Sequence, residues 1–322
     1  MPIEYYAFID IGSNTAYLYQ CEIGSTPQQT HSFQPKNSTN TVVNCRYLWF
    51  DPISSQYIAI DADTIYLYNS QGVYIADHVT TGITSASFGG SENLTTSGEL
   101  IICISPTVNT YATSASFLNT SLSVLRTITN FGNGTPKTPL TNVLCGAISR
   151  GFYYLAEGQV VIQYDGIYSF NTGLGPAGSS ITSMFVYHEE TVYGVFSNGP
   201  SYTVGKYELT TAGQDAVTQP TLVEIYNCVY DKATNQLRTS CADLTNNVKI
   251  LDPTTLQTTS SINFTPLVCQ YLGYTTGPTP PPPPPPPPPT PTPNITQSSK
   301  VNSDFNLFYT NFTGLGNIGY YF

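Results

Sequence analysis

The stretch YYAFIDIGSNTAYLYQCEIG, Tyr5–Gly24, decides the fold because its pattern recurs within the same chain. It consists of an apolar strand, an aspartate, a short polar turn and a second strand with Tyr-Leu-Tyr. The stretch QYIAIDADTIYLYNSQG, Gln56–Gly72, repeats this order, and FYYLAEGQVVIQYDG, Phe152–Gly166, is a looser copy. Aromatic and β-branched residues around short polar turns are typical of β-hairpins. The sequence therefore predicts an all-β fold built from repeated hairpins.

A second recurring segment precedes the hairpins and supplies the repeat length. Its equivalent positions are Cys45, Ser87, Cys145, Tyr187, Cys228 and Cys269, with spacings of 42, 58, 42, 41 and 41 residues. Units of about 40–45 residues made of short strands resemble the blades of WD40- and NHL-like β-propellers. We expect a six-bladed β-propeller over residues 1–276. The first unit lacks an inner strand, so we expect Leu267–Tyr274 to pair beside Tyr5–Ile11 and close the ring.

The motif FIDIGSNTAYLY, Phe8–Tyr19, also resembles the first phosphate-binding hairpin of the sugar-kinase, actin and exopolyphosphatase superfamily of ATPases. That resemblance implies turn amides that bind phosphate and a metal-directed Asp10. Such ATPases need several long helices, and the sequence has no long run at helical spacing. A second glycine-rich phosphate loop is absent as well, since SFGGSEN, Ser87–Asn93, is a poor substitute. We interpret the motif as the hairpin between the second and third strands of blade one.

Composition argues against several kinds of chemistry. Charged residues make up 9% of the chain, the net charge is −10, and ten Lys and Arg are spread thinly, so no basic patch for nucleic acid is expected. The sharpest polar cluster is His188–Glu190, a candidate metal or acid/base site whose alternative is an exposed turn. Asp61 and Asp63 suggest a calcium loop but lack its glycine and distal glutamate. We predict no catalytic residue, no metal site and no cofactor, and hence no enzyme.

Seven cysteines leave at least one without an intramolecular partner. Cys228 and Cys241 flank the turn DKATNQ and could face each other across paired strands, so a disulfide between them is one prediction. Cys45, Cys145, Cys228 and Cys269 recur on the predicted inner strands. Their alternative role is that of small buried apolar residues.

Seven N-x-S/T sequences permit glycosylation without demonstrating it. About as many are expected by chance in a chain so rich in Asn, Ser and Thr. The possible sites are Asn37, Asn93, Asn119, Asn133, Asn263, Asn294 and Asn311.

The composition changes abruptly at Gly277, where GPTPPPPPPPPPPTPTPN begins. Proline has a fixed φ and no amide donor, so residues 277–293 are predicted to form a polyproline II linker. Pro278–Pro293 would extend roughly 50 Å. The remaining residues, 294–322, are rich in aromatic side chains and too short to build a core alone. We predict an anchor segment with the aromatic residues Phe305, Phe308, Tyr309, Phe312, Tyr320, Tyr321 and Phe322.

These features together suggest a function. Low charge, Tyr-rich strands, Thr-Pro and proline tracts resemble surface and virion proteins of hyperthermophilic archaeal viruses, a likeness of composition alone. The start, MPIEYYAFIDIG, lacks the basic and apolar regions of a signal peptide, which suits assembly inside a host. No apolar run approaches a membrane span.

The resemblance implies a non-enzymatic, thermostable structural or host-attachment protein on a virion or extracellular surface. Its partners would be other structural subunits, reached through the C-terminal tail, and a host surface protein or glycan. One alternative is a secreted carbohydrate-binding propeller, although Trp49 is the only tryptophan. A second alternative is a propeller hydrolase, although His, Asp and Glu are scarce.

Overall fold

The structure is a computed structural model of the 322-residue chain. It describes residues 3–277 except 81, 89–99, 105–111, 132–137, 142, 150–151, 158–159, 165–168, 174–177, 188–189, 210–212, 219–220, 232–233, 244–246 and 265–271. The chain divides into two compact units, Met1–Thr279 and Pro280–Phe322. The second unit lies outside the described residues, so the linker and the aromatic anchor stay predictions.

The described residues form strands, which pair into six four-stranded antiparallel sheets and one two-stranded hairpin. We number the four-stranded sheets first to sixth in chain order. The first sheet has the order β26 (Gly273–Gly277), β1 (Ile3–Asp10), β2 (Thr15–Glu22), β3 (Gln28–Phe33). The second has β4 (Tyr47–Asp51), β5 (Gln56–Ile60), β6 (Thr64–Tyr68), β7 (Tyr74–Val79), and the third has β8 (Ile83–Phe88), β9 (Leu100–Ile104), β10 (Ser114–Leu118), β11 (Val124–Ile128).

The remaining three sheets follow the same meander. The fourth has β14 (Val143–Ser149), β15 (Phe152–Glu157), β16 (Val160–Tyr164), β17 (Ser169–Gly173). The fifth has β18 (Ser180–Tyr187), β19 (Thr191–Asn198), β20 (Ser201–Glu208), β21 (Gly213–Val217), and the sixth has β22 (Ile225–Asp231), β23 (Gln236–Cys241), β24 (Val248–Leu251), β25 (Thr258–Ile262). The short hairpin β12 (Asn130–Phe131) and β13 (Thr138–Pro139) lies between the third and fourth sheets in the sequence.

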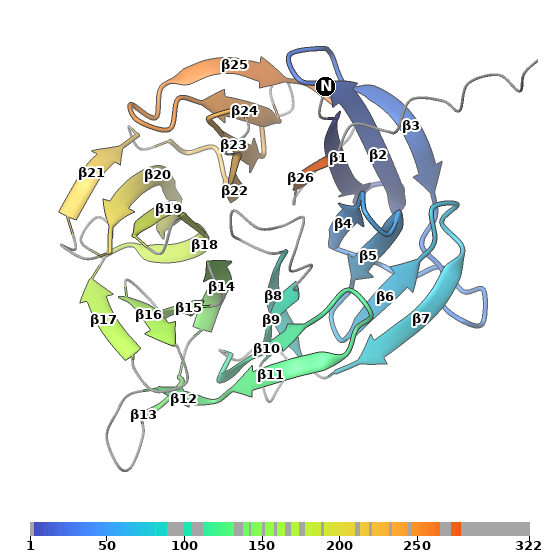
Figure 1. Ribbon diagram of the computed structural model, residues 1–322, viewed down its shortest axis with the longest axis horizontal. Coiled ribbons are helices and arrows are strands. Elements are labelled where there is room, and N and C mark those ends of the chain that lie inside the picture. Colours follow the sequence, from blue (N-terminus) through green and yellow to red (C-terminus); the bar gives the residue numbers. More distant parts are fainter. Residues whose placement is uncertain are drawn as a thin grey trace, which may run out of the picture. The chain divides into compact units, whose positions relative to one another are not determined.

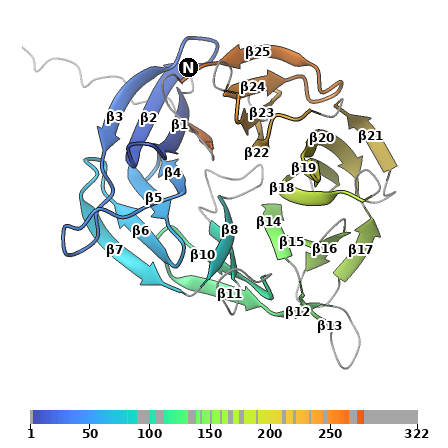
Figure 2. The ribbon, with the colours of Figure 1, turned by 180° about the vertical axis from the view of Figure 1, so that it is seen from behind.

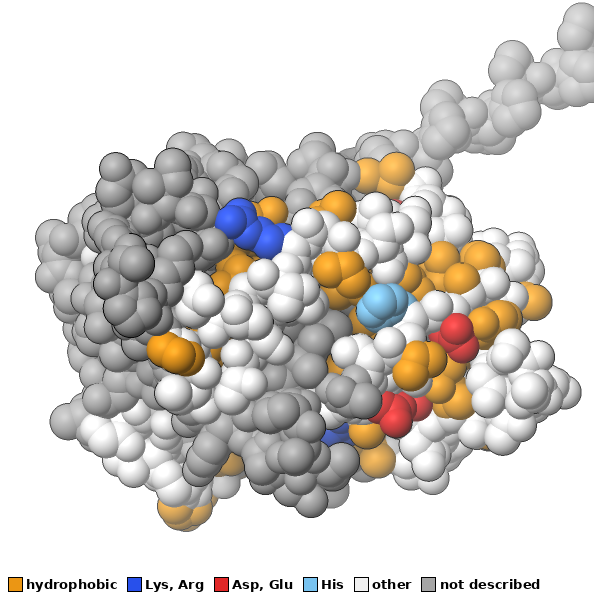
Figure 3. Space-filling view, turned by 90° about the horizontal axis from the view of Figure 1, so that it is seen from below, with side chains coloured by type: hydrophobic (Ala, Val, Ile, Leu, Met, Phe, Trp, Pro, Cys, Tyr) orange, Lys and Arg blue, Asp and Glu red, His pale blue; other side chains and the backbone are white. Residues whose placement is uncertain are grey.

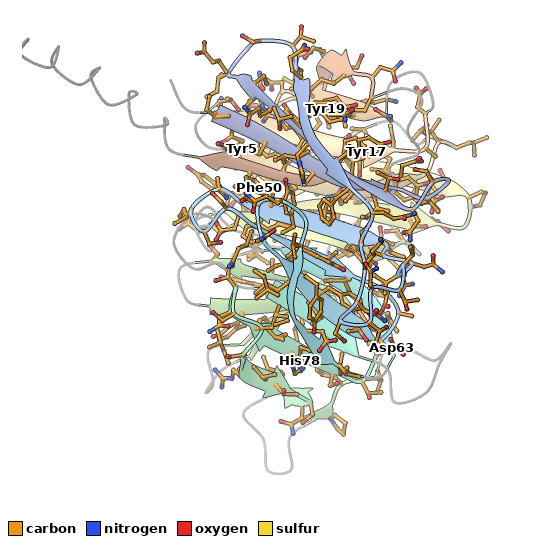
Figure 4. All side chains as sticks on the ribbon, turned by 90° about the vertical axis from the view of Figure 1, so that its right-hand side faces the viewer. Tyr5, Tyr17, Tyr19, Phe50, Asp63 and His78 are labelled. Carbon is orange, nitrogen blue, oxygen red and sulfur yellow. The ribbon has the colours of Figure 1, made fainter. Side chains whose placement is uncertain are left out.

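The first unit has a propeller arrangement: its sheets follow one another around a ring with their first strands innermost (Figures 1 and 2). Six clusters of buried apolar side chains hold the sheets together, and each cluster joins two consecutive sheets. Between the first and second sheets, the rings of Tyr5 and Phe50 lie 5.2 Å apart (Figure 4). Between the third and fourth, Phe117 and Tyr153 lie 4.4 Å apart. Burial of apolar surface between the sheets is thus the main source of stability.

The ring is closed by strand pairing between the two ends of the unit. β26 pairs antiparallel with β1, with Ile3 opposite Gly277 and Tyr6 opposite Tyr274. Of the predicted partner Leu267–Tyr274, residues 267–271 lie outside the described part, and the described strand that pairs with β1 is Gly273–Gly277. A side chain at Gly273 would collide with the carbonyl oxygen of Leu48, so glycine is needed where β26 approaches β4.

The hairpin motif Phe8–Tyr19 is the link between β1 and β2, the second and third strands of the first sheet, as predicted. Asp10 accepts hydrogen bonds from the backbone amides of Gly12 and Ser13 and from the Ser13 hydroxyl. Asn14 ends the turn with a φ of 50°, a conformation that asparagine tolerates better than most residues. The aspartate therefore stabilises its own turn.

The same turn occurs at other strand ends. Asp51 accepts from the amides of Ile53 and Ser54 at 3.0 and 3.3 Å, and Ser55 has a φ of 54°. Asp252 likewise accepts from the amides of Thr254 and Thr255. A local turn motif thus explains the resemblance to a phosphate-binding hairpin.

Candidate functional site

A buried arginine organises the contact between the sixth and first sheets. Arg238 lies on β23 and is only 1% exposed. Its Nε donates to the Tyr6 hydroxyl at 3.3 Å, and its Nη1 donates to Thr234 Oγ1 at 3.2 Å. Its Nη2 donates to Glu4 and, at 3.1 Å, to Gln236 Oε1. All three guanidinium nitrogens therefore have acceptors.

Two buried carboxylates balance this charge. Glu4 on β1 forms an ion pair with Arg238, and Asp231 Oδ2 at the end of β22 lies 3.7 Å from Arg238 Nη1. Both carboxylates also accept from the Tyr274 hydroxyl, at 3.2 Å for Glu4 and 2.9 Å for Asp231. Tyr274 belongs to β26, and the Arg238 guanidinium carbon lies 4.1 Å from the centre of its ring. We call Glu4, Tyr6, Asp231, Arg238 and Tyr274 the arginine cluster.

Protonation states in the arginine cluster follow from burial and charge. Burial raises the pKa of the Tyr6 and Tyr274 hydroxyls although Arg238 acts in the opposite direction. Burial disfavours the charged Arg238 guanidinium, but the neighbouring Tyr274, Tyr6 and Glu4 oxygens outweigh it and raise its pKa. Burial and then the Glu4 carboxylate raise the pKa of the nearby Cys21 thiol to about 12. The hydroxyls and the thiol are therefore neutral donors at neutral pH.

This geometry favours a structural role. A buried cation whose donors are already paired with protein oxygens has little capacity left for a ligand. The arginine cluster joins β1 and β26 of the first sheet to β22 and β23 of the sixth. It therefore stabilises the seam, which is the contact between the sixth and first sheets where the ring closes.

A pocket of about 480 Å³ opens beside the arginine cluster. One wall is the turn between β2 and β3, with Ser25 and Thr26, and the opposite wall contains Ser260 and Ser261 of β25. Glu4, Tyr6 and Arg238 also line the pocket although their side chains are almost fully buried. The accessible polar groups are thus mainly neutral hydroxyls, which suit an uncharged polar ligand.

Sequence reasoning missed the arginine cluster. Two weak signals were available: Glu4 interrupts the apolar run IEYYAF, and Arg238 interrupts QLRTSC. Charged residues are almost never fully buried unless they are paired, so these two interruptions of apolar strands could have suggested one buried pair. Glu4 and Arg238 are far apart in the sequence, so only the structure of the closed ring shows that they pair.

The predicted disulfide is wrong. Cys228 and Cys241 are both among the described residues, and no disulfide joins them. The register of β22 and β23 places Cys228 opposite Thr239 and Cys241 opposite Ile225, so the two cysteines are not cross-strand neighbours. Cys228 instead donates to the Tyr193 carbonyl at 3.4 Å. Its burial supports the alternative of a small core side chain.

Two of the possible glycosylation sites are turn residues. Asn37 Oδ1 accepts from the amides of Thr39 and Thr41, and Asn119 Oδ1 accepts from those of Ser121 and Ser123. Turn stabilisation accounts for asparagine at both places without a glycan. Asn263 is exposed. The other candidates, Asn93, Asn133, Asn294 and Asn311, lie outside the described residues.

The structure shows no metal site at the described residues of the two polar clusters that were metal candidates. Asp61 accepts from the amides of Asp63 and Thr64 at 2.9 and 2.7 Å, so it stabilises the β5–β6 turn. Of His188–Glu190, only Glu190 is described. Within the described ranges, no group of three or more His, Cys, Asp or Glu is placed to hold a metal ion. The part of the chain that the structure describes also has no helix long and apolar enough to cross a membrane.

Comparison with solved structures defines the class of fold. The chain is similar to U3-55K and to the WD40 repeats of RRP9, each with a TM-score of 0.51, 12% identity and 80% of this chain covered; the coverage of those chains is 80% and 79%. It is also similar to the C-terminal WD40 domain of Sif2, with a TM-score of 0.51, 12% identity and coverage of 82% and 84%. At this identity the likeness shows a WD40-like propeller fold and no function. No model of a known protein family matches the sequence, and the search of curated proteins finds no relative.

Proposed function

We propose that the protein is a non-enzymatic attachment protein, a six-bladed propeller head displayed on a virion or extracellular filament by its C-terminal segment. The loops of the head would contact a host surface or neighbouring subunits. Other structural subunits would receive the tail. The role is structural because the most developed polar site in the described residues, the arginine cluster, joins two sheets and has its donors paired internally.

The observation that carries the proposal is the way the chain leaves the ring. β26 completes the first sheet, and its last residue, Gly277, is followed directly by the proline tract. The six sheets of the described residues belong to the compact unit Met1–Thr279, and residues 280–322 form a separate unit. A head completed before a proline spacer and an aromatic segment suits display on a larger assembly.

The test is a chain ending at Thr279, which keeps all of β26. We expect it to fold with the same thermal stability as the full chain but not to enter the native particle. Purified particles assembled from either chain are compared by gel electrophoresis and electron microscopy. Normal incorporation of the shortened chain would overturn the proposal.

A second candidate function is carbohydrate binding, which the pocket between the first and sixth sheets favours. Its hydroxyl-rich walls, with Ser25, Thr26, Ser260 and Ser261, match an uncharged polyhydroxyl ligand. A glycan array probed with the chain ending at Thr279 tests this function. Signals unchanged by Ser260→Leu would place any sugar binding elsewhere.

A further inference from the structure

The outer strand of each sheet leaves one side of its backbone unpaired by the sheet, so a closed ring still has edges. β7 is such an outer strand: it pairs with β6 on its inner side and ends the order of the second sheet. It faces the viewer together with β3 in Figure 4, where His78 of β7 is labelled.

Hydrogen bonding in β6 and β7 identifies the amides on the open side. The Thr80 amide donates to the Asp63 carbonyl, and the register pairs Thr64 with Val79 and Tyr66 with Asp77. Bonded and non-bonded pairs alternate along an antiparallel ladder. The amides of Asp77 and Val79 consequently point away from β6, toward the open edge.

Apolar side chains are exposed along this edge. Val73, just before β7, and Ile75 and Val79 within it are 58%, 46% and 70% exposed, and the exposed Asp77 lies between the last two. On the right-hand part of the face in Figure 3, hydrophobic side chains lie beside a His and acidic side chains. Among the other outer strands, β11 also exposes apolar side chains, Val124 and Leu125, whereas β25 exposes Thr and Ser, and β3 exposes mainly Gln, Thr and Ser. Proteins usually protect edges with polar or charged residues, and an apolar edge invites strand addition.

We propose that the edge of β7 receives the segment Ser298–Phe322 of a second copy of this chain by strand addition. This inference rests on the proposed function, in which that segment is the anchor. The sequence DFNLFYTNF, Asp304–Phe312, places Phe305, Leu307 and Tyr309 on one face of an extended strand. Those side chains would pack across Ile75 and Val79, while the backbone of the segment pairs with the amides of Asp77 and Val79.

The spacer indicates which copy supplies the segment. Pro278–Pro293 would form a stiff rod of roughly 50 Å. A rod of this length carries the segment away from the head to which it is attached, so it favours the β7 edge of a neighbouring molecule. Repetition of this head-to-tail contact would join many copies into a filament or shell.

The experiment compares four proteins by sedimentation velocity over a range of concentrations. These are the full chain, the chain ending at Thr279, the full chain with Ile75→Lys and Val79→Lys, and the full chain with Leu222→Lys. Leu222 is 80% exposed and lies outside β7, so it is the matched control. Hydrogen exchange at the amides of Asp77 and Val79 is a second measurement, and thermal unfolding checks that each variant folds.

We expect the full chain and the Leu222→Lys control to associate equally. The dissociation constant of the β7 variant should be at least about tenfold higher. Association should slow exchange at Asp77 and Val79, and the chain ending at Thr279 should stay monomeric. If only truncation abolishes association, the β7 site is wrong while the anchor function survives. If the truncated chain associates like the full chain, the anchor function fails. A full chain that stays monomeric refutes the second copy as partner.

Discussion

Single residues hold the two ends of the ring together. Arg238 and Asp231 are buried charges on adjacent strands of the sixth sheet, whereas Glu4 lies on β1, so Glu4 is paired with Arg238 only because the ring brings the sixth and first sheets together. An uncompensated buried charge is costly, whereas a fully paired group can be neutral or modestly stabilising. The consequence is a seam that tolerates loss of the whole cluster better than loss of one member.

Arg238→Met should lower the free energy of unfolding by about 3–5 kcal/mol, because Glu4 and Asp231 would remain buried without their cation. Urea unfolding followed by tyrosine fluorescence measures this. The triple variant Glu4→Gln, Asp231→Asn, Arg238→Met should recover part of the loss. Equal stability of the wild type and Arg238→Met would show that the seam does not depend on the cluster.

Alkaline pH should destabilise the protein. Burial raises the pKa of the Cys228 thiol to about 12, and burial with the Glu4 carboxylate does the same for Cys21, against an ordinary value of 9.0. The folded chain therefore holds these protons more tightly than the unfolded chain. Stability is fully present below pH 9 and is lost as the pH rises toward 12.

The measurement is urea unfolding under reducing conditions between pH 7 and 11. Because buried tyrosines such as Tyr66, whose pKa burial raises to about 12, contribute in the same direction, Cys21→Ala with Cys228→Ala should make the decline shallower without abolishing it. Constant stability from pH 9 to 11 would contradict the expectation.

At the scale of single elements, the strands were more predictable than their ends. Alternating apolar residues located the β1–β2, β5–β6 and β15–β16 hairpins, and Asp-centred turns supported the first two, because turn chemistry and strand pattern are local properties. Register was not predictable. The turn between β22 and β23 pairs Asp231 with Gln236, and the register that follows places Cys228 opposite Thr239, not opposite Cys241.

The β1–β2 turn offers a direct test of a local motif against a nucleotide site. Asp10→Ala should lower the free energy of unfolding by about 1 kcal/mol, because the amides of Gly12 and Ser13 lose their acceptor. Asp10→Asn retains an acceptor oxygen and should cost less. Isothermal titration calorimetry with ATP and Mg²⁺ should show no heat of binding for either variant or for the wild type, and millimolar or tighter affinity would favour the ATPase resemblance.

The whole molecule depends on a strand contributed from the end of the ring. The repeat spacing predicted that the first unit borrows its inner strand, and β26 supplies it. The location of that strand could not be derived from the sequence, because Leu267–Tyr274 carries the same apolar pattern as the other inner strands. The close approach that requires Gly273 beside Leu48 exists only in the assembled ring. The arginine cluster escaped prediction for the same reason.

Two truncations separate the contribution of β26 from that of the tail. A chain ending at Leu272 lacks β26 and removes Tyr274 from the arginine cluster, so we expect a loss of at least about 3 kcal/mol. A chain ending at Thr279 retains both and is the control. Circular dichroism during thermal unfolding distinguishes them, and coincident unfolding curves would mean that β26 is dispensable.

Pairing of β26 with β1 also means that the first sheet can be completed only late in the protein's synthesis. Ile3 and Glu4 emerge from the ribosome first, but their partners Gly277 and Thr276 emerge only after every other strand of the six sheets. Until then the edge of β1 that pairs with β26 is uncovered. Such long-range pairing is slow to form and leaves a nascent chain prone to aggregation.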